Sequence, residues 1–201
     1  MKPKRIVFAT GNQDKMREIR MIMEDLEIPV ISMKEAGVSA DIVEDGSTFE
    51  ENAMIKARAI AKMLPEDIVM ADDSGLEIDF LNKEPGIYSA RYLGEKTSYD
   101  IKNNKILERL KDVPAEKRTA RFVCAVAAVF PGNEEVIGYG TMEGRIADHI
   151  AGENGFGYDP IFWLDDYGCT SAEISPEQKN ELSHRGKALR EVKKQLKALM
   201  I

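Results

Sequence analysis

Short apolar runs alternate with amphipathic helical patterns along the first third of this sequence, and this alternation limits the possible folds more than any other feature. The run Ile6–Ala9 ends in the turn residues Thr10–Asn12, and a helical pattern follows at once. Its apolar positions recur three or four residues apart, which places them on one face of a helix: Met16, Ile19, Met23 and Leu26. Strands that alternate with helices in this way are typical of α/β proteins.

The same patterns continue through the first half of the chain. They predict a strand over Pro29–Ser32, a helix over Thr48–Leu64 that stops before Pro65, a strand over Ile68–Ala71, a turn over Asp72–Gly75 and a strand over Leu76–Leu81 that leaves this turn. The acidic and small residues of the turn are common where a chain reverses direction.

The second half is predicted to contain a helix, a hairpin, a loop and a final helix. The segments are a helix over Tyr99–Leu110, a long strand over Arg118–Phe130, a turn over Pro131–Asn133, a returning strand over Val136–Tyr139, a glycine-rich loop over Gly152–Asp159 and an amphipathic helix over Ser183–Met200. We see no linker and no internal repeat, so we expect one α/β domain with a mixed sheet over residues 1–201.

Composition excludes several classes of protein. Lys and Arg number 28 against 35 for Asp and Glu, a net charge of −7, and an acidic chain is a poor general binder of nucleic acid. The longest apolar run, Val123–Phe130, is too short to cross a bilayer, which needs ~20 apolar residues. Cys124 and Cys169 lack metal-ligand spacing. We therefore expect a cytoplasmic protein with reduced thiols and no membrane partner.

The turn after the first strand is the first candidate site. Backbone N–H groups at a helix start lack partners within the helix and favour anions, and Gly11 lets a phosphate approach them. The residues expected to contact phosphate are Thr10, Gly11, Asn12, Gln13, Asp14 and Lys15. The alternative is an ordinary helix start capped by Thr10 or Asn12, with Lys15 in solvent.

Adjacent carboxylates form the second candidate site. Asp72 and Asp73 follow a buried strand, where they repel one another unless a cation or hydrogen bonds offset their charges. Carboxylate and phosphate oxygens are the ligands that Mg²⁺ prefers. The alternative is an acidic turn whose side chains bond the backbone. Glu44 and Asp45 form a further acidic group in a loop, which by itself is typical of solvated surface.

The glycine-rich loop could bind a nucleobase. Phe156 and Tyr158 could stack on it, with Asp159 as an acceptor, or these aromatic rings could pack into the core. Lys179, His184 and Arg185 gather cations around the start of the last helix, which favours anions but is also common on solvated faces. His149 has no such neighbours in the sequence and is interpreted as structural or surface.

Six segments, in this order, resemble the inosine triphosphate pyrophosphatase family, whose members hydrolyse non-standard purine nucleoside triphosphates. The segments are Ala9–Ile19, Phe49–Ala57, Ala71–Asp79, Pro85–Tyr92, Gly155–Phe162 and Ser183–Leu189. They span nearly the whole chain. The resemblance implies an elongated mixed sheet flanked by helices, two lobes with the active-site cleft between them, and a homodimer.

The resemblance also implies roles for individual residues. Thr10 to Lys15 would hold the triphosphate, and Asp73 would be the general base and, with Glu44, a ligand of one or more Mg²⁺ ions. Asp72 would support the site and Ser74 would touch the substrate. The base and sugar would be surrounded by Phe156, Gly157, Tyr158, Asp159, Lys179, His184 and Arg185.

The resulting hypothesis is that water attacks the α-phosphorus of ITP, dITP or XTP and that pyrophosphate leaves. A donor facing the 6-oxo group would reject ATP, which carries a 6-amino group there. Arg185, His184 or a backbone N–H near Phe156 could be that donor. Two alternatives stay open: a Mg²⁺-dependent phosphomonoesterase with Asp72 or Asp73 as nucleophile, and a non-catalytic nucleotide sensor.

Overall fold

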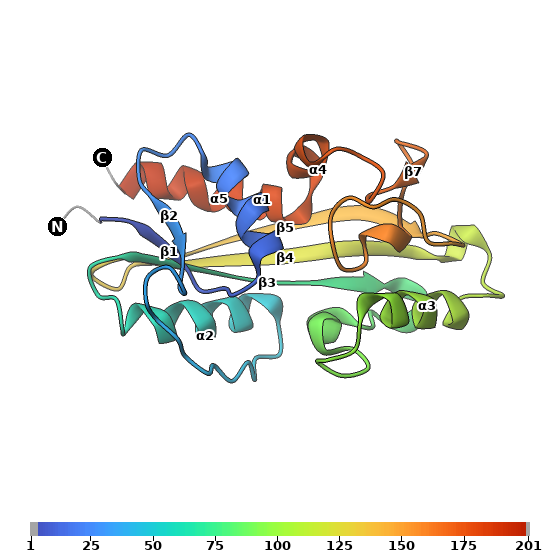
Figure 1. Ribbon diagram of the computed structural model, residues 1–201, viewed down its shortest axis with the longest axis horizontal. Helices are drawn as coiled ribbons and strands as arrows, with labels where there is room; N and C mark the ends of the chain where they lie inside the picture. Colours follow the sequence, from blue (N-terminus) through green and yellow to red (C-terminus); the bar gives the residue numbers. More distant parts are fainter. Residues whose placement is uncertain (1–3, 200–201) are drawn as a thin grey trace. The chain divides into compact units, whose positions relative to one another are not determined.

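Seven strands hydrogen-bond in the order β2-β1-β3-β4-β5-β6-β7 in the computed structural model, which describes residues 4–199 (Figure 1). The strands are β1 (Ile6–Phe8), β2 (Val30–Ser32), β3 (Ile68–Ile78), β4 (Thr119–Val129), β5 (Glu135–Ile146), β6 (Phe162–Leu164) and β7 (Cys169–Thr170). β1 runs parallel to β2 and β3, whereas the pairs β5–β6 and β6–β7 are antiparallel. The predicted mixed α/β sheet is therefore confirmed.

Five α-helices and four short 3-10 helices connect the strands within the described residues. The α-helices are α1 (Gln13–Met23), α2 (Phe49–Ala61), α3 (Tyr99–Arg109), α4 (Pro176–Leu182) and α5 (His184–Leu199). The 3-10 helices are η1 (Asp79–Leu81), η2 (Gly86–Arg91), η3 (Ala115–Lys117) and η4 (Asp159–Ile161). None of these helices is long and apolar enough to span a membrane.

The described chain divides into two compact units. The first comprises residues 4–73, 124–140 and 184–199, and the second comprises residues 74–123 and 141–183. Strands β1 and β2 belong to the first unit and β6 and β7 to the second, whereas β3, β4 and β5 contribute residues to both.

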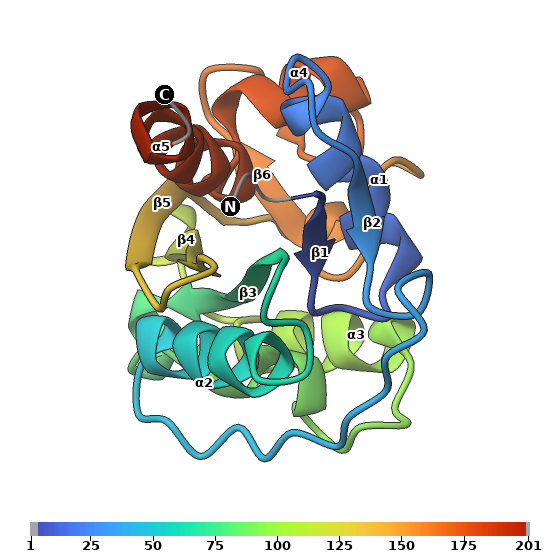
Figure 2. The same ribbon diagram turned by 90° about the vertical axis from the view of Figure 1, so that its left-hand side faces the viewer.

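In the first unit, α1 and α5 cover one face of the strands and α2 covers the other (Figure 2). Side chains alternate along a strand, so Ile6 and Phe8 face the α1 and α5 side, where a core cluster forms. The helices bury in that cluster Met16, Ile19, Ile22, Met23, Ala188, Leu189, Val192 and Leu196. The predicted apolar faces of both helices are thus confirmed, although Met200 and the side chain of Leu199 lie outside the described residues.

Two glycines let α5 lie against β5. A Cβ at Gly138 would come within 2.3 Å of the Ala188 carbonyl oxygen, and one at Gly140 within 2.3 Å of the His184 carbonyl oxygen. Real Cβ atoms do not approach so closely, so only glycine permits this backbone contact. Because His184 opens α5, Gly140 helps to fix where that helix begins.

The second unit has a core of its own, built around residues 74–78 of β3 and 119–123 of β4. Leu76 and Ile78 of β3 pack there with Ile106 of α3. The rings of Phe122 and Phe162 join the same cluster with centroids 4.5 Å apart. The core thereby holds α3 against the strands of this unit (Figure 1).

The predicted turn at Asp72–Gly75 is wrong. β3 continues without interruption from Ile68 to Ile78, and both aspartates lie inside it. The acidic and small residues of this segment are typical of turns, but here the two carboxylates have cationic partners, described below, that allow them to be buried in a strand. The returning strand is also longer than predicted, since β5 extends from Glu135 to Ile146.

Candidate active site

Asp72, on β3, is the centre of an ion-pair network in the first unit. Its carboxylate receives the Lys15 ammonium, with Nζ 3.1 Å from Oδ1 and 3.0 Å from Oδ2. Arg185 donates from Nε and Nη2 to Oδ2, each over 3.2 Å. Burial alone would raise the pKa of Asp72, but Lys15, Arg185 and Lys56 outweigh it and hold this pKa well below its usual range. Asp72 therefore stays ionised to lower pH than an ordinary aspartate.

Arg185 is bound by carboxylates on two sides. Besides Asp72, its Nη1 donates to Glu18 of α1, and only 2% of the Arg185 side chain is exposed. Burial lowers the pKa of Arg185, but Glu18 and Asp72 more than offset this and the pKa rises above its usual range. The sequence analysis named Arg185 as a possible hydrogen-bond donor to the 6-oxo group of the base. In the structure its guanidinium lies between Glu18 and Asp72.

Asp73 differs sharply from its neighbour, although the two are adjacent on the same strand. The Lys56 ammonium lies 3.7 Å from Asp73 Oδ1, and the residue is 8% exposed. Burial, together with the charges of Glu44 and Asp72, raises the pKa of Asp73 against the opposing effect of Lys56 and Lys15. Asp73 is thus the more basic of the two carboxylates, as a proton acceptor requires.

Lys56 of α2 is a site residue that the sequence analysis missed. Its Nζ donates to Glu44 Oε2 over 2.8 Å and also faces Asp73, so one ammonium contacts both carboxylates. Burial lowers the pKa of Lys56, but Asp73, Asp72 and Glu44 together raise it by more. The pKa of Lys56 therefore lies above its usual value. The signal was present in the sequence: Lys56 follows Ala53 by three residues and precedes Ile60 by four, which places it on the buried face of the helix.

The loop that carries Glu44 is fastened to α2 by a second missed residue. Asn52 is 1% exposed and its Oδ1 accepts from the Gly46 N–H over 2.9 Å. A Cβ at Gly46 would approach Asn52 Oδ1 to 2.7 Å and Glu51 Cβ to 2.8 Å. The close contact between loop and helix holds Glu44 near Lys56.

The start of α1 is capped in the way that the structural alternative predicted. Asn12 Oδ1 accepts from the backbone N–H groups of Asp14, over 2.9 Å, and Lys15, over 3.2 Å. Thr10 Oγ1 in turn accepts from the Asn12 N–H over 3.2 Å. Gly11, Asn12 and Gln13 are exposed. The helix start is therefore accessible, and Asn12 already bonds two of its amides.

In the second unit, Asp159 organises the glycine-rich loop. Its Oδ2 accepts from the Phe156 N–H over 2.8 Å and from Lys179 Nζ over 2.6 Å, and its Oδ1 accepts from Ser171 Oγ over 2.8 Å. Asp159 and Lys179 are buried. The sequence offered Asp159 as an acceptor for the base or sugar; in the structure the carboxylate bonds its own loop and α4.

The two aromatic residues of this loop have different surroundings. Tyr158 is 3% exposed and donates its hydroxyl to the Ser89 carbonyl over 2.7 Å, so it packs in the core as the structural alternative predicted. Phe156 is half-buried, and the Lys179 ammonium lies 5.1 Å from its ring centroid. Ser74, at the start of this unit's part of β3, is also half-buried. Of the two rings, Phe156 is the more exposed.

The carboxylate oxygens of Glu44 and Asp73 are suitable ligands for a magnesium ion. Within residues 4–199 no group of three or more His, Cys, Asp or Glu side chains is arranged to hold a metal. The two carboxylates nonetheless share a single cation, the Lys56 ammonium. Mg²⁺ bound with a nucleotide commonly takes one or two carboxylates and completes its shell with phosphate oxygens and water. Asp72 is less suited, because Lys15 and Arg185 already bind its oxygens.

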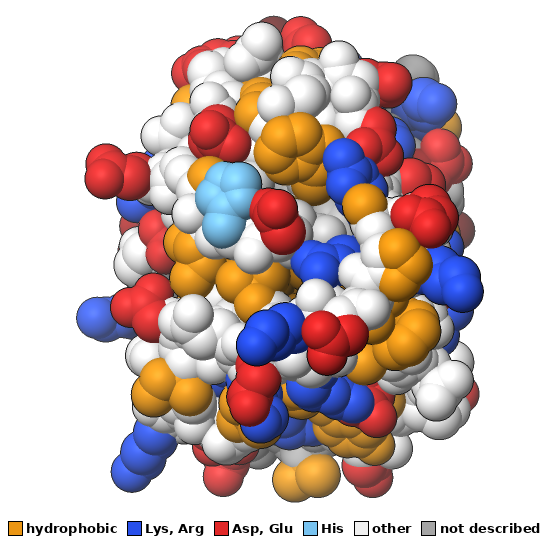
Figure 3. Space-filling view, turned by 90° about the vertical axis from the view of Figure 1, so that its right-hand side faces the viewer, with side chains coloured by type: hydrophobic (Ala, Val, Ile, Leu, Met, Phe, Trp, Pro, Cys, Tyr) orange, Lys and Arg blue, Asp and Glu red, His pale blue; other side chains and the backbone are white. Residues whose placement is uncertain are grey.

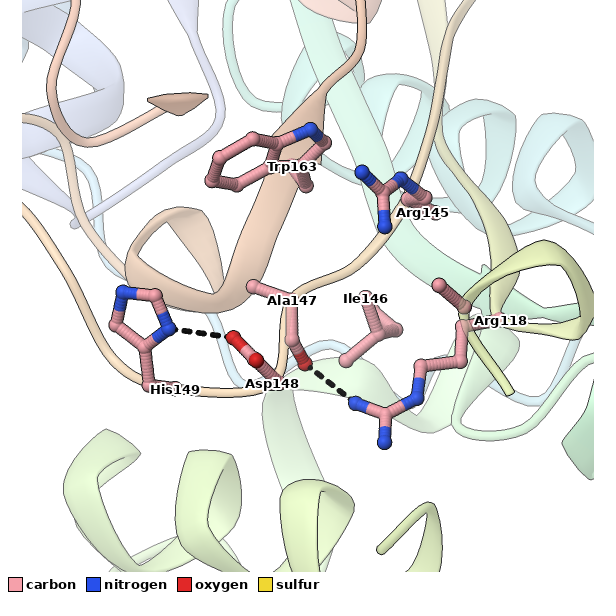
Figure 4. A pocket seen from close by; sticks show the side chains of 8 residues that line it. Arg118, Arg145, Ile146, Ala147, Asp148, His149 and Trp163 are labelled. Carbon is pink, nitrogen blue, oxygen red and sulfur yellow. Dashed lines mark hydrogen bonds and ion pairs between the residues drawn. The ribbon is translucent and has the colours of Figure 1, made fainter. Parts of the chain in front are cut away.

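A pocket of about 470 Å³ in the second unit contains none of the expected site residues (Figure 4). Its cations are already engaged: Arg118 donates to four backbone carbonyls, and Arg145 pairs with Asp165 and stacks on Trp163. His149 lies there at the surface beside Asp148. On the face shown in Figure 3, acidic, basic and hydrophobic side chains are interspersed. Neither the pocket nor this surface is as good a candidate for the active site as the cluster around Asp72 and Asp73.

Comparison with known proteins identifies the family. The model of the Ham1 family matches residues 6–195, and the chain belongs to this family. It is 49% identical over 189 residues to the dITP/XTP pyrophosphatase of Caldanaerobacter subterraneus subsp. tengcongensis, covering 94% of each chain. It is 44% identical over 202 residues to that of Clostridium perfringens, covering 98% of this chain and 99% of the relative. The resemblance carried by the six motifs is confirmed.

Solved structures agree with this assignment. The Staphylococcus aureus Ham1 protein superposes with a TM-score of 0.86 at 45% sequence identity, and the match covers 97% of this chain and 99% of that one. A Ham1 protein from Coxiella burnetii matches with the same TM-score at 42% identity, over 96% and 98% of the two chains. The fold described above is thus the Ham1 fold.

Proposed function

We propose that the protein hydrolyses the non-standard purine nucleoside triphosphates ITP, dITP and XTP to the nucleoside monophosphate and pyrophosphate. The observation that carries the proposal is the pair of adjacent carboxylates on β3: Asp72 is ion-paired with Lys15 at the start of α1, while Asp73 has a raised pKa beside Lys56 and Glu44. Membership of the Ham1 family, with relatives named dITP/XTP pyrophosphatases, supports the same activity.

The triphosphate binds at the start of α1 in this proposal. Thr10, Gly11, Asn12, Gln13 and Asp14 supply polar groups there, and the helix dipole favours the anion. Lys15 adds a charge fixed by Asp72. Because Asn12 Oδ1 already bonds two helix-start amides, phosphate oxygens would either replace it or use the amides that it leaves free.

Asp73 accepts the proton of the attacking water. A carboxylate whose pKa lies above the usual aspartate value is a stronger base than an ordinary aspartate. Asp72, held ionised, keeps Lys15 and Arg185 in place. Glu44 and Asp73 would hold Mg²⁺, which when bound neutralises charge on the triphosphate and its leaving group. The attack is on the α-phosphorus, with pyrophosphate as the leaving group.

Selectivity comes from the residues around the base and sugar. Phe156 would stack on the purine, and Ser74, Gly157, Tyr158, Asp159, Lys179, His184 and Arg185 would contact or shape its binding region. A hydrogen-bond donor facing position 6 accepts the 6-oxo group of ITP and XTP and meets a second donor in ATP. In keeping with the family resemblance, we also propose a cytoplasmic homodimer that binds neither nucleic acid nor membrane.

One assay tests the proposal. The pure protein is incubated with Mg²⁺ and, separately, with ITP, dITP, XTP, ATP and GTP, and the released phosphate species is identified. Pyrophosphate from the first three, with ATP turned over at least ~100-fold more slowly, is the expected result. Orthophosphate and a phosphoenzyme would point to the phosphomonoesterase alternative, and nucleotide binding without turnover to the sensor. Either result would refute the proposed function.

A further inference from the structure

Asn103, in the middle of α3, lies outside all six motifs but contacts the glycine-rich loop directly. Its Nδ2 donates to the Gly157 carbonyl over 3.1 Å, and the residue is only 2% exposed. Helix α3 is in contact with η4, which follows the loop directly. A buried amide on a helix therefore holds a peptide group between Phe156 and Asp159, the part of the loop expected to meet the base.

The orientation of the Asn103 amide follows from its partner. A backbone carbonyl only accepts hydrogen bonds, so the nitrogen of the amide must face Gly157. The oxygen, Asn103 Oδ1, is then buried without a hydrogen-bond partner. Buried polar atoms without partners are rare and need a reason, because each one has lost its bonds to water. The bond from Nδ2 to Gly157 is what fixes the amide in this orientation.

The loop needs such support because its backbone is unusual. Gly155 and Gly157 have φ values of +74° and +70°, in the left-handed region that glycine adopts readily because it has no Cβ. Asp159 fixes the Phe156 end through the Phe156 N–H. The ring of Tyr99, one turn before Asn103, lies under Gly157, 3.5 Å from the position that a Cβ there would take. Asn103 and Tyr99 together fix the remaining peptide.

We propose that Asn103 is a positioning residue for base selectivity: by holding the Gly157 peptide it sets the direction of the loop backbone that meets the purine. This inference rests on the proposed function and deepens it. Asn103 touches the loop rather than the triphosphate, so it affects how well the correct base binds and leaves the chemistry at Asp73 unchanged. Displacing a binding group by a fraction of an ångström lowers affinity for the substrate that it fits.

The test compares Asn103→Asp with Asn104→Asp. Both make the same chemical change on the same helix, but Asn104 is exposed and donates only to the Asp100 carbonyl of its own helix. In Asn103→Asp a carboxylate oxygen replaces the donor and faces the Gly157 carbonyl. We expect the ratio of kcat/KM for ITP to that for ATP to fall ~10-fold or more, mainly through a higher KM for ITP with kcat nearly unchanged.

Several outcomes are decisive. If Asn103→Asp keeps the wild-type ratio, as Asn104→Asp should, or if kcat for both nucleotides falls in parallel, the inference is wrong. If Asn103→Asp does not fold, Asn103→Ala, which removes the donor without adding a charge, must show the same change in ratio. The proposed function is judged separately, since wild-type protein that releases no pyrophosphate from ITP contradicts that function before any variant is compared.

Discussion

Asp72 in the first unit and Asp159 in the second are both buried carboxylates, but their surroundings serve different ends. Asp72 is bound by the long cationic side chains of Lys15 and Arg185, which belong to α1 and α5. Asp159 is bound by a lysine, a hydroxyl and a backbone N–H of its own loop. The first arrangement fixes charges in space, and the second fixes the course of a backbone.

The neighbours of these two carboxylates complete the contrast. Next to Asp72 lies Asp73, whose pKa is raised and which contacts the Lys56 ammonium, as Glu44 does. Next to Asp159 lies Tyr158, a core residue that adds no charge. We infer that the first unit carries the chemistry and that the loop of the second carries recognition. The predictions below test each half of that division.

The largest effect is expected for Asp73→Asn. It removes the proton acceptor and one proposed metal ligand but keeps the size of the side chain, so we expect kcat for ITP to fall by ~10³-fold or more. Binding of ITP should change little. Steady-state kinetics and a direct binding measurement check both statements. Near-normal turnover would show that Asp73 is not the base and that the first unit does not work as described.

Next comes Asp72→Asn, which should damage stability as well as activity. Removing the carboxylate leaves the buried Arg185 and Lys15 with fewer counter-charges, and breaking a buried ion pair costs about 3 kcal/mol or more. Urea denaturation measures the loss. The matched control is Glu66→Gln, whose pair with Lys4 is exposed and should contribute almost nothing. Equal stability of the two variants would contradict the role given to Asp72.

A smaller effect is expected from Gly155→Ala in the second unit. The new Cβ would lie 2.2 Å from Asp159 Oδ2 at a φ of +74°, so we expect the unfolding free energy to fall by about 2 kcal/mol and selectivity for ITP over ATP to weaken. Gly168→Ala is the control, because its φ is +65° but no atom lies within 4 Å of the new Cβ. The two losses should differ; if they match, Asp159 does not shape the loop.

The smallest effect concerns pH and separates the adjacent aspartates. The pKa of Asp73 is higher in the folded protein than in the unfolded chain, so ionisation of Asp73 destabilises the folded protein. This destabilisation is absent at low pH, where Asp73 is protonated in both states, and it is fully present above the folded-state pKa. Asp73→Asn should therefore be more stable than wild type near neutral pH, with the difference vanishing in acid. Asp72 has a lowered pKa, so the stability that it contributes is lost only in strong acid. Denaturation curves across pH measure both trends.

Much of the fold could be predicted from periodicity, because α1, α2 and α5 bury apolar faces and β1, β3 and β4 contain apolar runs. Asp72–Gly75 is the exception: local composition indicated a turn, whereas Lys15, Arg185 and Lys56, all distant in sequence, allow the strand to continue. A prediction based on neighbouring residues has no access to such partners. The length of β5 was missed for a similar reason, since its glycines pack against α5 and look like turn residues in isolation.

The candidate site was predicted by residue type better than by role. Asp72, Asp73 and Lys15 do lie together in the first unit. Lys56 and Asn52 were missed because a polar residue on the buried face of a helix was not treated as a signal. Arg185 and Asp159 were predicted near the base and sugar, and in the structure their side chains bond other protein groups. Whether a charged side chain faces a ligand or another side chain depends on packing across the fold.

The most direct test of the central claim is hydrolysis of ITP in ¹⁸O-labelled water with wild-type protein and Mg²⁺. If the first unit directs water to the α-phosphorus, the label appears in the nucleoside monophosphate and the pyrophosphate is unlabelled. Label in pyrophosphate would place the attack on the β-phosphorus, and label in orthophosphate would place it on the γ-phosphorus. Either of these results would contradict the account.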